Sequence, residues 1–257
     1  MVNKMLLVID IGNTSITLGL YRSSVLENTL RTPTDKNANE EKYYKIFSDL
    51  LHSCNITECI ICSVADEITF VVKNAIDKLF SINSVILDYK LNIGVKLRTD
   101  KPETVGADRI ANVFYAYKRN LLPAIIVDMG TATTFDVINK EGEFIGGIIM
   151  PGLGLQMDSL FQRTSKLPQI EIKESNIAIG NDTESCILSG VIRGQACAID
   201  GLLTQCEAEL GESVKVILTG GYSSLIAKYT NRKFDEINPN LTLEGIRLAY
   251  EEYLVSC

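Results

Sequence analysis

Short apolar runs alternate with amphipathic stretches along this chain, and their order predicts the first structural elements. Residues 5–10 form an apolar run that ends in an Asp, a polar turn follows at 11–14, and a second apolar run covers 16–21. This order of strand, tight polar turn and strand is typical of a β-hairpin. Two further short runs, at 59–64 and 85–87, predict two more strands in the first half.

Helices in the first half are predicted by apolar residues that recur every three or four positions. After a polar loop at 31–41, this spacing runs through residues 43–54 and again through 68–79. A third stretch of this kind, residues 110–117, follows the sequence Gly-Ala-Asp-Arg at 106–109. Strands mixed with helices in one segment predict an α/β fold.

The second half opens by repeating the pattern of the first. Residues 124–128 form an apolar run that ends in Asp128, and another apolar run returns after a polar turn. The two turns align as Asp-x-Gly-Asn at Asp10 and Asp-x-Gly-Thr at Asp128, and they lie 118 residues apart. That offset is far longer than a solenoid repeat and is typical of a duplicated lobe. We therefore expect an α/β protein of two lobes, residues 1–121 and 122–257.

The rest of the second half continues the mixture of strands and helices. A strand is expected at 148–150, and the Pro-Gly turn at 151–154 leads into a short helix. A long helix is expected over 183–210, a strand over 214–218, and a final helix over 242–255.

Charge and composition narrow the partners that the chain could bind. The 257 residues include 25 Lys and Arg against 32 Asp and Glu, a formal net charge of −7, with no basic cluster. A nucleic acid partner is therefore not expected, because phosphate backbones attract basic surfaces. The longest apolar runs are about five residues, against the ~20 that a membrane helix needs, so we expect neither a membrane span nor a signal peptide. The sequence predicts a globular protein of the cytoplasm.

Cysteine and histidine usage argues against several kinds of site. The seven Cys are scattered and odd in number, which predicts reduced thiols rather than a disulfide framework. Cys59 and Cys62 form a Cys-x-x-Cys pair, but they lie in a strand-like run rather than at the helix start that redox pairs use. His52 is the only His, which leaves little support for a His-rich zinc site or a Ser-His-Asp triad.

The two Asp-Gly turns together have the chemistry of a phosphate site, although one such turn alone is ordinary loop chemistry. Gly lets backbone N–H groups approach an anion, Thr and Ser hydroxyls add donors, and Asp can hold a hydrated divalent cation. If the lobes face each other, the turns at Asp10 and Asp128 would grip one polyphosphate from two sides. Gly220 and Gly221 follow a strand, where a nucleoside could lie against the backbone. Neither a Walker loop nor a Gly-x-Gly-x-x-Gly turn after a strand occurs.

Five motifs, in their order and spacing, resemble those of the type III pantothenate kinases. They are Asp10-Ile-Gly-Asn-Thr14, Gly106-Ala-Asp-Arg109, Asp128-Met-Gly-Thr-Ala-Thr-Thr134, Pro151-Gly-Leu153 and Thr219-Gly-Gly221. The resemblance covers nearly the whole chain, including Arg31-Thr32 near the first loop, residues 164–168 and Leu241-Thr-Leu243 before the last helix. That family belongs to the superfamily of acetate and sugar kinases, Hsp70-type chaperones and actin. The resemblance implies an α/β fold of two ribonuclease-H-like lobes, an actin-like ATPase duplication, with an ATP cleft between them.

The resemblance also implies a role for each matching residue. ATP would be bound by a first phosphate loop and by residues of the second lobe: Asp10, Ile11, Gly12, Asn13, Thr14, Ser15, Ile16, Thr17, Thr131, Gly220 and Gly221. Pantothenate would be bound by Thr99, Gly106, Ala107, Asp108, Arg109 and Thr183. Asp108 would be the catalytic base that takes the proton from the substrate hydroxyl. Mg2+ at Asp10 and a monovalent cation, K+ or NH4+, at Asp128 would assist, and a homodimer built largely on the long second-lobe helix is implied.

Several of these residues also have simpler structural explanations. Asp108 would serve equally as a capping residue in the first turn of its helix, where the helix dipole lowers the pKa of an Asp. Arg109 would form a surface ion pair outside a pocket, and Thr183 would cap its own helix. Thr99 stands where the family usually has a Tyr that contacts the substrate, so the substrate pocket would differ in shape.

Two other functions stay open at this point. The same ATP site could serve another small hydroxyl acceptor, as in a sugar kinase, and the difference at Thr99 keeps this alternative. The second alternative is a nucleotide-binding regulator without turnover, against which the acidic charge and the retained Asp10, Asp108 and Asp128 argue. The resemblance implies an ATP-dependent phosphotransferase that converts pantothenate to 4'-phosphopantothenate, the first step toward coenzyme A, and this is the function that we expect.

Overall fold

The computed structural model describes residues 5–91 and 93–256, and the chain divides into two compact units. Unit 1 comprises Met1–Val95, Asp100–Lys118 and Thr242–Cys257, and unit 2 comprises Lys96–Thr99 and Arg119–Leu241. The expected boundary between residues 121 and 122 lies near one of the crossings between units. A single cut does not describe the division, however, because the last helix belongs to unit 1 and residues 96–99 belong to unit 2.

Unit 1 is built on a five-stranded sheet with the first apolar run near its centre. In sheet order the strands are β3 (Val25–Pro33), β2 (Ser15–Arg22), β1 (Met5–Ile11), β4 (Ile56–Ser63) and β5 (Val85–Leu87). β1 pairs antiparallel with β2 and parallel with β4, and β2 pairs antiparallel with β3. The predicted hairpin is confirmed. The prediction missed β3, because its mostly exposed side chains form no apolar run.

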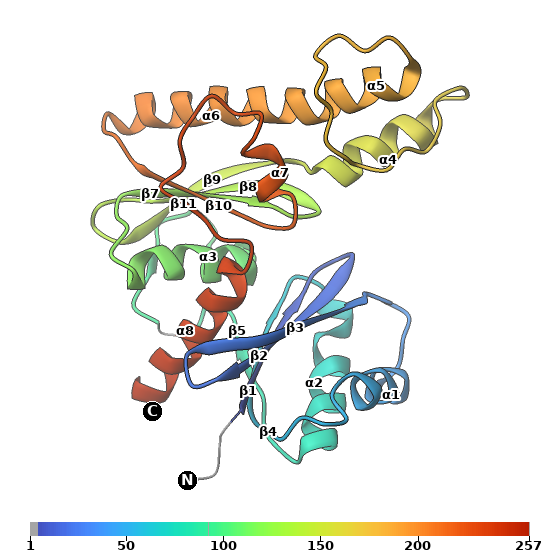
Figure 1. Cartoon of the computed structure of the whole chain (residues 1–257). Coiled ribbons are helices and arrows are strands. Elements are labelled where there is room, and N and C mark those ends of the chain that lie inside the picture. Colours follow the sequence, from blue (N-terminus) through green and yellow to red (C-terminus); the bar gives the residue numbers. More distant parts are fainter. Residues whose placement is uncertain (1–4, 92, 257) are drawn as a thin grey trace. The chain divides into compact units, whose positions relative to one another are not determined.

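Helices of unit 1 cover its sheet (Figure 1). α1 (Glu40–Leu50) and α2 (Asp66–Phe80) pack on one face, where Leu7 of β1 joins Phe47 and Val72 in one buried cluster. α1 begins where the Asn39 side chain accepts the backbone N–H of Lys42, as an N-cap residue does. The remaining helices of this unit are the 3-10 helix η1 (Pro102–Thr104), α3 (Ala107–Lys118) and α8 (Leu241–Ser256).

The final helix, α8, is fixed to α3 by a very close backbone approach. Gly245 lies so near Ala111 that a Cβ at this position would overlap the Ala111 carbonyl. One turn earlier, the Thr242 hydroxyl donates to Asn112 Oδ1 at 2.8 Å, so Thr242 bonds to α3 rather than capping its own helix. Because α3 in turn packs on β4, these contacts make α8 part of unit 1.

Unit 2 repeats the strand arrangement of unit 1. Its sheet order is β11 (Glu236–Ile237), β10 (Lys215–Thr219), β7 (Ala124–Met129), β8 (Ala132–Ile138), β9 (Glu143–Pro151) and β6 (Lys96–Leu97). β7 pairs antiparallel with β8 and parallel with β10, and β8 pairs antiparallel with β9. The order β9-β8-β7-β10-β11 therefore corresponds to β3-β2-β1-β4-β5. This match confirms the duplication that the two Asp-Gly turns predicted.

Helices of unit 2 pack on one face of its sheet. They are α4 (Leu153–Arg163), α5 (Thr183–Leu188), the π-helical turn η2 (Ser189–Arg193), α6 (Gly194–Leu210) and α7 (Ser223–Ile226). Ile192, Ile199 and Leu203 join Val127 of β7 in the buried core of the unit. The stretch predicted as one helix is continuous over Thr183–Leu210, with a π-helical turn at Ser189–Arg193 between α5 and α6.

The stretch Thr183–Leu210 is also long and apolar enough to cross a membrane when judged by length and composition alone. Its most apolar 18-residue window has a mean hydropathy of 1.3, which the short apolar runs of the sequence do not suggest. The core helix of a globular domain meets the same criterion, and this helix buries Ile199 and Leu203 in unit 2. Packing within the unit therefore accounts for its composition.

Candidate active site

The turn over residues 10–17, the predicted first phosphate loop, is held by its own backbone and by the segment after β3. The Gly12 N–H donates to the Ser15 carbonyl at 3.0 Å and closes the turn. The Thr34 hydroxyl donates to the Gly12 carbonyl at 2.7 Å, and the Thr34 N–H donates to the Thr14 carbonyl at 3.0 Å. These bonds direct both carbonyls toward the protein. The exposed tip is left to N–H groups and side chains, as an anion site requires.

The side chains of this loop divide into anchors and exposed groups. Ile11 and Ile16 are fully buried and fix the two ends of the turn in the core. Asn13 and Thr14 are exposed at the tip, and Ser15 is partly exposed. Side-chain contacts to a phosphate would therefore come from the polar residues, whereas the two Ile could offer only their backbone.

Asp10 lies at the end of β1, opposite Thr17 of β2 and Cys62 of β4. Cys62 is fully buried, and the pKa of its thiol is well above the usual value, first because of burial and then because of the negative charges of Asp10 and Asp108. Both carboxylates thus act on one buried thiol. The structure therefore brings the phosphate loop and the predicted base to the same end of the unit 1 sheet.

Asp108 lies in the first turn of α3, behind a glycine that makes room for it. The Ile110 N–H donates to the Gly106 carbonyl at 3.2 Å, so Gly106 precedes the helix and Asp108 is inside it. A Cβ at Gly106 would come within 2.5 Å of Asp108 Oδ1, which accepts the Arg109 N–H at 2.7 Å. Ala107, the first residue of α3, is buried.

Burial has a larger effect on the pKa of Asp108 than the interactions that stabilise its charged form. Desolvation raises the pKa of this carboxyl above its ordinary value, although the Arg109 N–H bond and the Arg109 charge act in the opposite direction. The lowered pKa that the simpler capping explanation would give is therefore not found, because desolvation outweighs the effects that stabilise the charged form. A raised pKa makes the carboxylate a stronger base.

The second Asp-Gly turn in unit 2 is tightly packed around its Asp. Asp128, at the end of β7, lies opposite Thr219 of β10. Gly220 has a φ of +87°, and a Cβ there would come within 2.6 Å of Asp128 Oδ1 and 2.7 Å of the Met129 nitrogen. Only Gly fits this conformation and this space. The Thr-Gly-Gly motif thus brings its backbone directly against the Asp128 carboxylate.

The Pro-Gly motif supports the same turn from the other side. The Gly152 N–H donates to the Thr131 carbonyl at 3.1 Å, and a Cβ at Gly152 would overlap the carbonyls of Gly130 and Thr131. The side chain of Thr131 is exposed, and so is Gly221 at the start of the turn into α7. Within unit 2, the structure therefore gathers three of the predicted motifs around one Asp.

Two predicted substrate residues, Thr99 and Thr183, belong to unit 2, whereas residues 106–109 belong to unit 1. Thr99 follows β6, and its Oγ1 is buried without a hydrogen-bond partner in the described part of the chain. Thr183 is exposed at the first position of α5, where Asp182 supplies the N-cap by accepting the Ser185 N–H at 2.7 Å. Thr183 is therefore not the cap of its helix.

Three residues near the unit 1 loop had no predicted role. The Cys62 thiol is buried and feels the negative charges of Asp10 and Asp108, and Arg31 and Lys36 contact the loop from β3 and the segment after it. The sequence signals were that the family resemblance includes Arg31 without giving it a role, and that Arg31 and Lys36 flank a polar segment soon after the hairpin. The Cys59 thiol is also buried, and burial raises its pKa to about 12. Buried thiols of this kind are unreactive, which agrees with strand packing rather than redox chemistry for the Cys-x-x-Cys pair.

The two Asp-Gly turns provide oxygen atoms that a cation could bind. Among residues 5–91 and 93–256, no group of three or more His, Cys, Asp or Glu gathers as a protein-only metal site. Mg2+ does not need one, because it keeps several waters and uses one or two carboxylates with the substrate phosphates. In unit 2, the buried Thr219 Oγ1, opposite Asp128, has no hydrogen-bond partner among the described residues. Asp10 and Asp128 therefore fit oxygen-bound cations.

Comparison with known proteins identifies relatives over both units. Residues 6–205 match the family model for type III pantothenate kinase. A type III pantothenate kinase from Geotalea daltonii is 38% identical over 252 residues, covering 96% of this chain and 98% of the relative. One from Moorella thermoacetica is 37% identical over 252 residues, covering 96% of this chain and 99% of the relative.

Solved structures resemble the chain in fold at lower identity. A Baf family protein from Campylobacter jejuni has a TM-score of 0.60 at 22% identity and covers 96% of this chain and 98% of its own. A ROK family glucokinase from Streptomyces griseus, solved with glucose and AMPPNP, has a TM-score of 0.58 at 13% identity and covers 96% of this chain and 100% of its own. These similarities support the two-lobed ATPase fold.

Proposed function

Because this chain belongs to the type III pantothenate kinase family, we propose that it is an ATP-dependent phosphotransferase that converts pantothenate to 4'-phosphopantothenate. The observation that carries the assignment to residues is the placement of Asp108. Its carboxylate has a raised pKa and lies in unit 1 with the Asp10 turn. A base and a phosphate loop in one unit are the parts that a kinase needs.

Asp108 is the general base in this proposal. Its carboxylate accepts the proton of the pantothenate hydroxyl as that oxygen forms a bond to the γ-phosphorus of ATP. The bond from that phosphorus to the bridging oxygen breaks, and ADP leaves with the bonding electrons. Since phosphoryl transfer needs mainly positioning and charge neutralisation, one base and a set of oriented donors suffice.

The remaining residues bind and orient the two substrates. Backbone N–H groups and polar side chains of residues 10–17 bind ATP phosphates, with Thr131, Gly220 and Gly221 as further ATP contacts. Residues 106–109, Thr99 and Thr183 bind pantothenate. The Arg109 guanidinium suits the pantothenate carboxylate, because its planar fork can hold a carboxylate with two hydrogen bonds.

Two cations complete the proposed site. Mg2+ would be held at Asp10 and a monovalent cation, K+ or NH4+, at Asp128, where they would neutralise phosphate charge. The carboxylate oxygens of Asp10 and Asp128, and the Thr219 Oγ1 opposite Asp128, which has no hydrogen-bond partner in the described part of the chain, support this assignment as cation ligands. The chain's own contribution is to place both carboxylates at the ends of central strands.

A homodimer and a cytoplasmic location extend the proposal. α6, with the π-helical turn before it, is long and apolar, and Cys197 and Gly201 are exposed on it. An exposed helix of this length is a suitable interface for a twofold dimer. The net charge of −7 supports small-molecule rather than nucleic acid partners.

The test is ADP release from Mg-ATP with pantothenate, measured in K+ and again in Na+. We expect pantothenate-dependent turnover that K+ stimulates, and a loss of at least 100-fold in Asp108→Asn, which keeps size but removes the base. Asp49→Asn, an exposed carboxylate on α1, is the matched control and should keep full activity. ATP binding without pantothenate-dependent turnover would contradict the proposed reaction, and a panel of other hydroxyl acceptors would then identify the substrate.

A further inference from the structure

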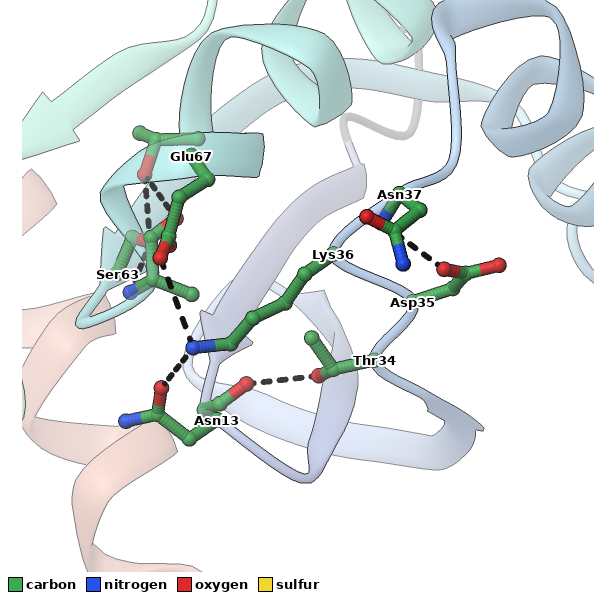
Figure 2. Close-up of polar contacts among 10 residues, drawn as sticks. Asn13, Thr34, Asp35, Lys36, Asn37, Ser63 and Glu67 are labelled. Atoms are coloured by element: carbon green, nitrogen blue, oxygen red, sulfur yellow. Dashed lines mark hydrogen bonds and ion pairs between the residues drawn. The ribbon is translucent and has the colours of Figure 1, made fainter.

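A lysine outside the predicted motifs contacts the phosphate loop directly. Lys36 Nζ donates to Asn13 Oδ1 at 2.7 Å, and on its other side it lies 3.7 Å from Glu67 Oε1 of α2 (Figure 2). The ammonium thus bridges the loop tip and the first turn of a helix, all within unit 1. Glu67 limits where the flexible lysine can lie.

An arginine of β3 makes a second contact with the same loop. Arg31 Nε and Nη2 donate to Ser15 Oγ at 2.9 and 2.6 Å. Between the two cations, Thr34 bonds to the loop backbone at Gly12 and Thr14. The end of β3 and the segment after it therefore form a continuous support beneath the loop.

The chemistry of the two cations determines how the loop side chains are oriented. Lys and Arg side chains carry hydrogen-bond donors and no acceptor. Asn13 must therefore turn Oδ1 toward Lys36, which leaves both hydrogens of Nδ2 directed elsewhere. Ser15 Oγ uses its lone pairs for Arg31, which leaves its O–H free to donate. A phosphate needs donors, so both loop side chains are held in the orientation that a phosphate requires.

We propose that Arg31 and Lys36 are positioning residues for nucleotide phosphates, which hold the Ser15 hydroxyl and the Asn13 amide as donors and add two positive charges beside Asp10. The inference rests on the proposed function in assigning residues 10–17 to ATP. Arg31 lies in a segment that the family resemblance includes but to which it assigns no role, and Lys36 lies in none of the motifs that carry the resemblance. A purely structural surface contact is the alternative, and it predicts an effect on stability without preference for phosphate.

The chain supplies a matched control for this alternative. Lys42, on the first turn of α1, forms an ion pair with Asp35 at 2.6 Å and has a similarly exposed side chain. Asp35 lies within the same supporting segment, yet no contact of Lys42 with the loop is found among the described residues. Lys42→Met removes a lysine from this segment and leaves the loop side chains untouched.

The experiment measures the Kd of ATP and of adenosine by titration calorimetry for wild type and for Lys36→Met, Arg31→Met and Lys42→Met. We expect Lys36→Met and Arg31→Met to weaken ATP binding by about tenfold or more, as expected for hydrogen bonds that involve charged groups. Adenosine, which has no phosphate, should bind all four proteins equally. Lys36→Arg, which also offers only donors, should restore most of the ATP affinity, whereas Lys36→Gln should not.

Steady-state kinetics provide the second readout. The two cation variants should raise the KM for ATP while leaving the KM for pantothenate within twofold of wild type. Equal loss of ATP and adenosine affinity, or unchanged ATP affinity, would overturn the inference. If wild type binds ATP without phosphorylating pantothenate, the proposed reaction fails, while the ATP and adenosine comparison still decides the role of Lys36 and Arg31. A wild-type chain that binds no ATP would reject both.

Discussion

Asp108 carries its charge where its surroundings disfavour ionisation, because burial removes water from the carboxylate. A group whose pKa is raised on folding favours the protonated folded state. The unfolded chain ionises first as pH rises past about 3.9, so wild type loses stability from that pH up to the raised pKa of Asp108. Above that pKa the loss is constant. At neutral pH, the buried Asp108 carboxyl therefore lowers the unfolding free energy of the protein.

Asp108→Asn should remove this loss, because an amide does not ionise. We expect the variant to gain unfolding free energy relative to wild type as pH rises through the same window, with no difference below it. Urea titrations between pH 3 and 7 measure this.

Asp182→Asn is the control of opposite sign, because hydrogen bonds from Ser185 lower the pKa of Asp182. In wild type, the ionised Asp182 carboxylate adds to the unfolding free energy above the ordinary pKa of Asp, and this contribution is lost on acidification. A variant of Asp108 that is equally or less stable at pH 7 would contradict the burial argument.

Gly220 is the residue where one added methyl group should damage the cation site. Its φ of +87°, together with the 2.6 Å that would separate an added Cβ from Asp128 Oδ1, leaves no room for Ala. Gly220→Ala should cost on the order of 1–3 kcal/mol of unfolding free energy and reduce the stimulation of turnover by K+ over Na+. Urea unfolding and the K+ to Na+ rate ratio measure both effects.

The neighbouring glycine is the comparison for that prediction. Gly221 has no positive φ and no described atom within 4 Å of an added Cβ. The Gly221→Ala variant should have an unfolding free energy within about 0.5 kcal/mol of that of wild type. Similar losses at both glycines would show that the close approach to Asp128 is not the cause.

At the scale of elements, α8 holds in place the helix that carries the proposed base. Gly245 of α8 meets the Ala111 backbone of α3, one turn after Asp108. Gly245→Ala should force the helices apart, costing about 1–3 kcal/mol as overpacking does, and should lower kcat by moving α3. Urea unfolding and pantothenate-dependent ADP release measure the two effects.

Gly201→Ala provides the matched change in another helix. Gly201 lies inside α6, is exposed, and has no described atom near an added Cβ. Ala favours a helix interior, so this variant should gain about 0.5–1 kcal/mol. Two glycine-to-alanine changes in helices should thus shift stability in opposite directions. Stabilisation by Gly245→Ala would disprove the close packing of α8 on α3.

The elements that could be predicted are those with a buried, periodic pattern. The hairpins after Met5 and Ala124 and helix α2 followed directly from their apolar positions. β3 did not, because an exposed strand at the sheet edge has no apolar run to mark it. The π-helical turn over 189–193 was also missed, since the helix continues on both sides of it.

At the scale of the whole molecule, the duplication was visible in the sequence and the division into units was not. Asp10 and Asp128 predicted two matching sheets, because a strand that ends in Asp-x-Gly is a local pattern. The return of α8 to unit 1 depends on Gly245 meeting Ala111, a contact between distant positions that no local pattern records. The candidate site was likewise predictable where local sequence motifs mark it and not where it depends on contacts between distant positions. Motif residues were found by resemblance, whereas Arg31, Lys36 and Cys62 needed the folded chain to reveal them.

The place of α8 in the chain has a consequence for synthesis. Translation delivers residues from the N-terminus, and domains of a nascent chain fold as units once their residues have emerged. Unit 2 ends at Leu241, the first residue of α8, whereas unit 1 needs the rest of α8 to pack against α3. Unit 2 can therefore finish folding on the ribosome. Unit 1, with the proposed base, can be completed only after all of unit 2 has been made, because α8 follows unit 2 in the chain.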